Sequence, residues 1–476
     1  MLLRLKMGRI VIGKVAGTAV AGLILAAMAG CVSFHNKSIS PKESANSFES
    51  RRLDAPEVKT FIASSLGHEM VSWPPEQWNL ELLTLAAWYY NPDLKIARAN
   101  WELAKAGIVT AAEFPNPSLG LTPQYDTDAT SGLSPWVLNV PLNFLIETVG
   151  KRDYRMDTAR NLSAAAQWDI STTAWQVRSS LREALVNVYS AVHKEEILAE
   201  QLRLQSELVR LLEKQLKHGQ ISRMEFDKGR IPEDQARLSV VEIRKQIDEN
   251  RAALAETMGL PEAATSQIGL SFTCIEILPS GQLPAQIRTE ALLSRPDLLS
   301  LLCTYDAAQS ALQLEIAGQY PNIVLGPGYE FDQGQNKWGL QFNAALPVFN
   351  QNAGPIAQTE AKRKQAAEKF EAQQIKVIGN IDRATIRYNK WLEVLREADT
   401  ILARRTEQEK AAQVRFDAGD VGRAELLSAK LSRNAAELSR LDAFISAQQA
   451  LGLLEDAVMR PLICRSNDQE FGQAGM

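Results

Sequence analysis

The chain contains one series of motifs twice, about two hundred residues apart. Residues 91–94 (Asn-Pro-Asp-Leu) and 295–298 (Arg-Pro-Asp-Leu) each open a helical pattern. Each is followed by a proline-containing strand start, a second strand and a long helix. Pro115 and Pro321, at the two strand starts, are 206 positions apart. A duplication of this size predicts that one unit, a helix followed by a β-hairpin and a long helical hairpin, is built twice.

The N-terminus has the pattern of an export signal. Basic residues precede an apolar stretch over residues 15–29, and small residues follow it. This order is typical of a secretory signal peptide over residues 1–30, not of an anchor helix. Residues 28–31 (Met-Ala-Gly-Cys) resemble a bacterial lipobox, which implies that Cys31 is acylated and anchors the chain in the outer membrane. The alternative is an ordinary signal peptide with a chance cysteine.

Four segments alternate apolar and polar side chains, which is the pattern of a β-strand with one wet face. They form two predicted hairpins, at about 117–143 and 321–347. The side chains predicted on the apolar faces are Leu119, Leu121, Tyr125, Trp136, Leu138, Val140, Leu142, Ile323, Leu325, Tyr329, Phe331, Trp338, Leu340, Phe342 and Ala344. A lipid-facing barrel strand has this pattern, and so does a half-buried hairpin of a soluble protein. The strand lengths and the long flanking helices favour the barrel.

Two hairpins per chain cannot close a barrel. An open sheet edge is not tolerated in hydrocarbon, because its N–H and C=O groups would have no partners. We therefore expect each chain to contribute its strands to a barrel shared with other copies, so that oligomerisation follows from membrane insertion.

The helices after the hairpins are unusually long. No proline occurs from residue 151 to 217 or from 356 to 416. Helices of this length extend roughly 90–100 Å. Apolar residues recur with spacings of 3 and 4 over 198–216 and 427–445. This period predicts left-handed coiled-coil pairing.

The return helices are expected at about 222–258 and 422–459, after turns that match each other at an offset of 200. Gly229 and Pro232 stand inside the first return helix only, so we expect a kink there. The predicted order is a signal peptide (1–30), a lipid-anchored tether or irregular equatorial segment (31–78), a first repeat (79–260, tip 218–223), a linker (261–290), a second repeat (291–460, tip 418–423) and a C-terminal tail (461–476).

Three cysteines remain if Cys31 is acylated. An exported chain can join two of them. Cys274 and Cys464 both follow the ends of equivalent helices and are the better pair, which leaves Cys303 free. Three free thiols are the alternative.

Together these motifs resemble the TolC-like outer-membrane efflux family, also called outer membrane factors. The resemblance covers about residues 80–460 and includes residues 346–354 (Leu-Pro-Val-Phe-Asn-Gln-Asn-Ala-Gly) and 415–420 (Arg-Phe-Asp-Ala-Gly-Asp). The residues around Phe349 and Asn350 look most like the subgroup that serves heavy-metal efflux pumps.

The resemblance implies a fold that is mainly α with a small β part. In a homotrimer, twelve strands would form an outer-membrane barrel that a helical tunnel continues across the periplasm. The chain would be the passive duct of a tripartite efflux system for metal cations or drugs. Its tips would contact a periplasmic adaptor, or membrane fusion protein, which links it to an inner-membrane transporter of the RND type. The tip residues are Gly219, Gln220, Ile221, Ser222, Arg223, Gly419, Asp420, Val421, Gly422 and Arg423.

In the family, acidic residues just past each tip line the closed constriction. This implies that role for Glu425 and for Glu225, its equivalent in the first repeat. Ser428 stands where the family has a second acid one turn later. Three copies of Glu425 around an axis would form a ring that favours cations. The alternative is that both acids merely occupy the first turn of a helix, where negative charge is favourable.

The sequence contains no pattern of catalytic chemistry. The four histidines have no mutual metal-ligand spacing, and neither Cys-x-x-Cys nor a Gly-Lys-Ser/Thr phosphate loop occurs. We therefore expect no enzyme activity, cofactor or metal site, and the net charge of −4 does not favour nucleic acid. Two other functions stay open: a type I protein-secretion channel, and a structural coiled-coil lipoprotein without a pore.

Overall fold

The computed structural model describes residues 32–70, 72–129, 132–266, 268–279 and 286–463. They fall into two compact units, one that ends at Ser50 and one that begins at Arg51. The first contains helix α2 (Pro41–Glu49), whose N-cap Ser40 accepts a hydrogen bond from the Glu43 N–H. The second contains the remaining described helices and strands.

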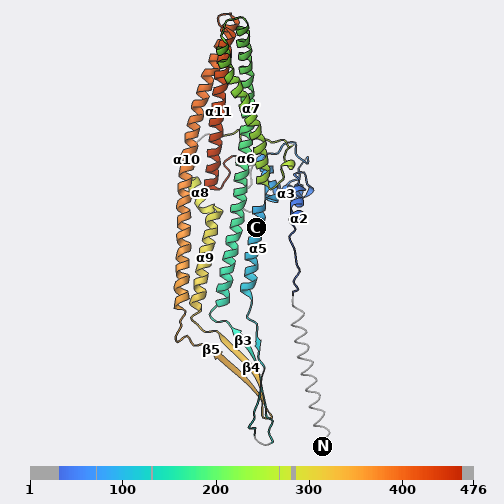
Figure 1. Cartoon of the computed structure of the whole chain (residues 1–476). Helices are drawn as coiled ribbons and strands as arrows, with labels where there is room; N and C mark the ends of the chain where they lie inside the picture. The colour runs from blue at the N-terminus through green and yellow to red at the C-terminus, as the bar shows by residue number, and fades with distance from the viewer. Residues whose placement is uncertain (1–31, 71, 130–131, 267, 280–285, 464–476) are drawn as a thin grey trace. The chain divides into compact units, whose positions relative to one another are not determined.

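The larger unit builds one series of elements twice, as the duplicated motifs predict. The first series is α5 (Pro92–Ala112), β1 (Ser118–Leu119), β2 (Thr122–Tyr125), β3 (Trp136–Ile146), α6 (Lys151–Lys217) and α7 (Arg223–Met258). The second is α9 (Pro296–Ala317), β4 (Ile323–Asp332), β5 (Gln335–Ala344), α10 (Ala353–Asp417) and α11 (Arg423–Val458). The strands lie at one end of the long helices, and the turns of the helical hairpins lie at the other (Figure 1).

The helices pack side by side in one layer. In the half nearest the strands their order is α5, α6, α9, α10, and in the other half it is α7, α6, α11, α10 (Figure 1). The layer therefore ends in two different edges, α10 on one side and α5 with α7 on the other. Within the described residues, none of these helices combines the length and the apolar composition that a membrane span requires.

The strands form one antiparallel sheet in which the two repeats meet. β3 pairs with β4, and β1, β2 and β5 lie outside this central pair. The first strand of the hairpin predicted at about 117–143 is split into β1 and β2. Gly120 N–H donates to Pro141 O at 2.9 Å, but Pro141 has no N–H to return the bond.

The register brings the predicted apolar side chains of all strands to one face. Tyr329 pairs with Val140 on one side and Trp338 on the other. The Tyr329 and Trp338 rings lie 5.0 Å apart between centroids. Trp338 is 81 % exposed and Phe342 is 70 % exposed. This face is therefore an uncovered apolar surface.

The opposite face of the sheet is polar. Asn139, Glu330 and Lys337 follow one another across β3, β4 and β5. Lys337 Nζ lies 2.6 Å from Asp332 and 3.6 Å from Glu330. The strong contrast between the two faces follows from the period-two alternation of the sequence.

Residues 346–354 lead into α10, and the structure explains why asparagine stands at position 352 of this motif. Asn352 is the N-cap and has φ +60°, a left-handed conformation that asparagine tolerates better than most residues. Its Nδ2 donates to Glu315 O at 2.7 Å, at the end of α9. Gly150, with φ +68°, occupies the same place before α6. Each long helix thus begins from a left-handed residue.

The second helical hairpin contains a buried seam, as its heptad spacing predicts: Leu427 and Leu441 of α11 are buried. The predicted seam of α6 over 198–216 is only partly buried, and the buried Leu204 lies beside it. Asn434, in the predicted seam of α11, is also buried, and its Nδ2 donates to Ile197 O at 3.0 Å. A buried asparagine at such a position fixes the register of paired helices.

Gly229 allows α7 to approach α6 closely. A Cβ at this position would overlap Leu212 Cδ1. Pro232 lies inside α7, which extends over its full range as one helix. The kink expected there stays a prediction.

Residues 51–90 are more regular than predicted. An irregular segment was expected up to residue 78, but α3 (Pro56–Leu66) forms there and buries Val58 and Ile62. These two residues are four apart, so they share one face of the helix. The sequence patterns also do not predict α4 (Leu80–Tyr90) or the short α8 (Gln286–Ser294) as separate helices.

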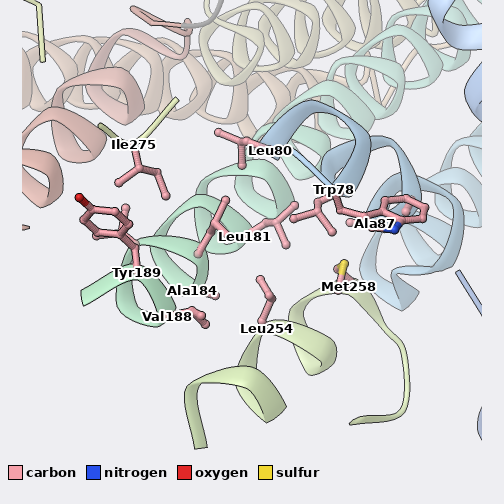
Figure 2. Close-up of a cluster of buried hydrophobic side chains, with 14 of the residues drawn as sticks. Trp78, Leu80, Ala87, Leu181, Ala184, Val188, Tyr189, Leu254, Met258 and Ile275 are labelled. Atoms are coloured by element: carbon pink, nitrogen blue, oxygen red, sulfur yellow. The ribbon is translucent and has the colours of Figure 1, made fainter. Parts of the chain in front are cut away.

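The larger hydrophobic core lies where these segments meet the long helices. Trp78 and Leu80 belong to it, together with Leu181 of α6 and Leu254 and Met258 of α7 (Figure 2). A buried leucine contributes about 1.5–3 kcal/mol. The core therefore fixes α3 and α4 against the middle of the layer.

Candidate functional site

The two predicted tips are hairpin turns of the same backbone type. Gly219 has φ +71°, and the Gln220 N–H donates to a carbonyl five residues earlier at 2.8 Å. Gly419 has φ +83°, and the Asp420 N–H makes the equivalent bond at 2.9 Å. This is the Schellman ending of a helix, in which glycine supplies the left-handed residue. The matching sequences at offset 200 therefore do encode matching turns.

The first return helix begins with a capping box. The Glu225 N–H donates to Ser222 Oγ at 3.2 Å, and Glu225 Oε2 accepts from the Ser222 N–H at 2.7 Å. The hydrogen bond from this backbone N–H lowers the pKa of Glu225. Glu225 is thus a capping acid in the first turn of α7, and its place in the constriction stays a prediction.

The second return helix begins differently, because Gly422 has no side chain that could cap it. Glu425 instead pairs with Arg415 at the end of α10, with Nη1 and Oε1 3.0 Å apart. Both side chains stay more than half exposed. Ser428 is exposed one turn later, on the same side of α11 by its spacing. Glu225 and Glu425 therefore make different contacts, although they occupy equivalent positions in the two repeats.

The arginines that follow the two turns also differ. Arg223 pairs with Asp227 of its own helix at 3.1 Å. Arg423 instead donates through Nε to Glu207 of α6 at 2.8 Å. It therefore ties the second turn to the first repeat. Of the other tip residues, Ile221 and Val421 are partly buried and the remainder are exposed.

A buried polar network, which the sequence did not predict, joins the two repeats further along the helices. Arg182 of α6 donates to Gln448 O at 3.1 Å and to Gln448 Oε1 at 2.9 Å. Its Nε lies 3.3 Å from Glu455. Gln448 and Glu455, both on α11, are 0 % and 2 % exposed. Burial lowers the pKa of the Arg182 guanidinium, and the Glu455 carboxylate opposes that effect.

The same network holds two segments outside the helices. Gln448 Nε2 donates to the carbonyls of Ile275 and Ile277 in the linker, the second at 2.9 Å. Glu455 Oε1 accepts from the Leu462 N–H at 2.7 Å. The network therefore joins α6, α11, the linker and the segment after α11.

One sequence signal could have indicated this network. Gly452 lies inside α11, where glycine is unfavourable. A Cβ at Gly452 would lie 2.5 Å from Arg182 Nη1. A glycine kept inside a helix indicates that another group approaches closely.

The cysteines agree with the expectations where they can be compared. Cys274 is disulfide-bonded, and Cys303 is a free thiol. Cys464, the predicted partner, and Cys31, the predicted lipidation site, lie outside the described residues. Across the described part of the chain, no group of three or more His, Cys, Asp or Glu side chains could hold a metal ion.

Known proteins are similar to this chain in sequence and in fold. The cobalt-zinc-cadmium resistance protein CzcC of Cupriavidus metallidurans is 24% identical over 349 residues, which cover 71% of this chain and 80% of that protein. The probable outer membrane lipoprotein SilC of Salmonella typhimurium is 23% identical over 308 residues, which cover 59% of this chain and 64% of that protein.

Among solved structures, CusC, described for its folding and transmembrane channel formation, matches with a TM-score of 0.65 at 19% identity. The match covers 80% of this chain and 91% of CusC. It confirms the predicted fold class, which is mainly α with a small antiparallel sheet. The family model for outer membrane efflux proteins matches residues 87–260 and 287–458. The chain therefore belongs to the outer membrane efflux protein family.

Proposed function

We propose that the chain works as a homotrimer and is the outer-membrane duct of a tripartite system that exports metal cations. The observation that carries this proposal is the uncovered apolar face of the sheet, opposite a polar face. Lipid outside and water inside are the environments that such a pair of faces fits.

The open ends of the sheet support assembly. Among the described strands, β5 pairs only with β4, and β1 and β2 pair only with β3. In hydrocarbon these outer edges need partners, which further copies of the same sheet can supply. With β1 and β2 counted as one interrupted strand, three copies give twelve strands, an even number as in bacterial outer-membrane barrels.

The two edges of the helical layer also support a closed ring. α10 exposes Ile375 and Ile386, 70 % and 62 % exposed. At the other edge, α5 exposes Leu103 and α7 exposes Leu238. Because the edges differ, contact between copies is head to tail, and such contacts form a ring when the rotation from copy to copy closes.

The tips and the gate complete the proposal. The hairpin turns lie at the end of the helices away from the strands and would meet a periplasmic adaptor, which links the duct to an inner-membrane transporter of the RND type (Figure 1). Glu425 would form the constriction with Ser428, because it is not held in a helix cap as Glu225 is, and its carboxylate stays more than half exposed although it pairs with Arg415. The name of CzcC supports cobalt, zinc and cadmium as substrates.

A lipid on the N-terminal cysteine would also anchor the proposed duct to the membrane. Cys31 would carry the lipid, and SilC, a relative, is named a probable lipoprotein. Mass spectrometry of the mature N-terminus tests this assignment. A free, unmodified N-terminus at another residue would exclude it.

Reconstitution tests the duct. The purified protein is expected to be a trimer in detergent and to conduct ions in planar bilayers. Glu425→Gln is expected to lower the preference for cations over anions, whereas Glu225→Gln leaves it unchanged. A trimer that never conducts would indicate a structural lipoprotein instead, and equal selectivity in all three proteins would exclude the gate.

A deletion strain tests the substrate. We expect sensitivity to cobalt, zinc and cadmium, with unchanged sensitivity to drugs. Normal metal resistance together with the loss of one secreted protein would favour a type I secretion channel.

A further inference from the structure

The two tips have diverged in charge although their backbones match. Three lysines of the first tip have no cationic equivalent at offset 200 in the second. The pairs are Lys214 and Val414, Lys217 and Asp417, and Lys228 and Ser428.

The acids of the first tip are already engaged. Glu213 pairs with Lys217 at 3.1 Å, and Asp227 pairs with Arg223. Glu225 is held in the capping box. These acids therefore neutralise only Lys217 and Arg223 among the cations of the first tip.

Four exposed cations of the first tip remain without an ion-pair partner among the described residues. They are Arg210, Lys214, Lys228 and Arg230. At the second tip, in contrast, Lys410 pairs with Glu407, Arg415 with Glu425, and Arg423 with Glu207. One cation there, the partly buried Lys430, has no ion-pair partner among the described residues. The two tips therefore offer different surfaces to a partner.

The cations on α6 have a defined position. Glu207, Arg210, Lys214 and Lys217 follow one another at spacings of 3 and 4 and so share one side of the helix. Glu207 contacts Arg423 at the start of α11. The positive side of α6 therefore lies next to the junction between the two helical hairpins.

We propose that this first-tip surface, formed by Arg210, Lys214, Lys217, Lys228 and Arg230, docks an acidic surface of the periplasmic adaptor. The inference rests on the proposed function, in which the tips meet an adaptor, and it specifies the chemistry of that partner. Complementary charge orients a partner during association and selects it against others. The second tip, where three of the four cations are paired, contributes the less ionic part of the contact.

A defined peptide tests the surface. Binding of a fluorescein-labelled oligo-glutamate peptide to the detergent-solubilised trimer is measured by fluorescence anisotropy at low and high salt. The triple variant Lys214→Val, Lys217→Asp, Lys228→Ser gives the first tip the residues of the second. We expect binding to weaken with salt in the wild type, and the triple variant to bind at least about tenfold more weakly.

A matched control removes the same charge elsewhere. Lys362, Lys364, Lys369 and Lys376 of α10 are exposed and have no ion-pair partner among the described residues. Their replacement by Gln changes the net charge by the same four units per chain and is expected to leave peptide binding unchanged. Equal weakening in both variants would show that only net charge matters and would overturn the proposal.

Two further outcomes are decisive. Salt-independent binding of the peptide, or none, overturns the proposal. So does binding of the trimer to isolated peptidoglycan, which also carries carboxylates, with no binding to the peptide. Conductance of the same preparations separates this result from a failure of the proposed duct, since a trimer can conduct without any preference for acidic peptides.

Discussion

Gly452→Ala probes the buried network through a single methyl group. The new Cβ would lie 2.5 Å from Arg182 Nη1, so the guanidinium must move. Arg182 cannot move without loss, because its two terminal nitrogens donate to Gln448 and its Nε faces Glu455.

The expected loss can be estimated from these contacts. Each charge-assisted hydrogen bond contributes about 1.5–3 kcal/mol, so the two bonds to Gln448 together contribute about 3–6 kcal/mol. Alanine is more favourable than glycine inside a helix by about 1 kcal/mol. The net destabilisation is therefore about 2–5 kcal/mol, similar to that of breaking a buried ion pair.

Hydrogen exchange measured by mass spectrometry reports this loss locally. Peptides from the second half of α11 are expected to exchange at least about thirtyfold faster in the Gly452→Ala protein, since 1.4 kcal/mol corresponds to a factor of ten. Gly379→Ala is the matched control, because Gly379 lies inside α10 with open space around its Cβ position. It is expected to slow exchange slightly. Equal or slower exchange in Gly452→Ala would refute the reasoning.

Three other perturbations test separate features. Because its capping bonds lower the pKa of Glu225, their contribution to stability is present above the ordinary pKa and is lost as the pH falls through the lowered one. The protection of the amides at the start of α7, measured relative to their intrinsic exchange rate at each pH, should therefore fall in acid in the wild type and not in Glu225→Gln; identical profiles would contradict this. Asn352→Ala loses the bond to the end of α9 and strains a left-handed residue, so we expect a loss of about 1–3 kcal/mol in unfolding free energy, seen as a lower thermal midpoint; an unchanged midpoint counts against it. Leu340→Lys puts a charge on the apolar face and should reduce membrane insertion by about 2–4 kcal/mol, whereas Gln341→Lys, on the polar face, should insert normally; equal insertion of both would mean that the faces are assigned wrongly.

Local patterns made the repeated elements predictable. The alternation around Trp338 and Leu340 sets which side chains share a face, and this depends only on neighbours in the sequence. The lack of proline across α6 and the glycine after it likewise define a long helix and its end. The capping box at Ser222 and Glu225 is a local pattern too.

Contacts between distant segments were not predictable in this way. The sequence predicts exposed helix positions for Arg182, Gln448 and Glu455, because no neighbouring residue indicates that α6 and α11 bury them against each other. The pair of Arg423 with Glu207 depends in the same way on how two hairpins lie together. α3 was missed because the prolines and polar residues around Val58 and Ile62 outweighed two apolar positions.

The pairing of β3 with β4 has a consequence for biogenesis. Val140 and Tyr329 are partners although 189 positions separate them along the chain. While the polypeptide emerges, the edge of β3 in its first hairpin therefore has no hydrogen-bonding partner until much of the second repeat has crossed the inner membrane. Such distant pairings are slow to form, and exposed strand edges readily join wrong neighbours. We expect transport to the outer membrane to depend on chaperones that cover this strand edge until β4 is available to pair with it.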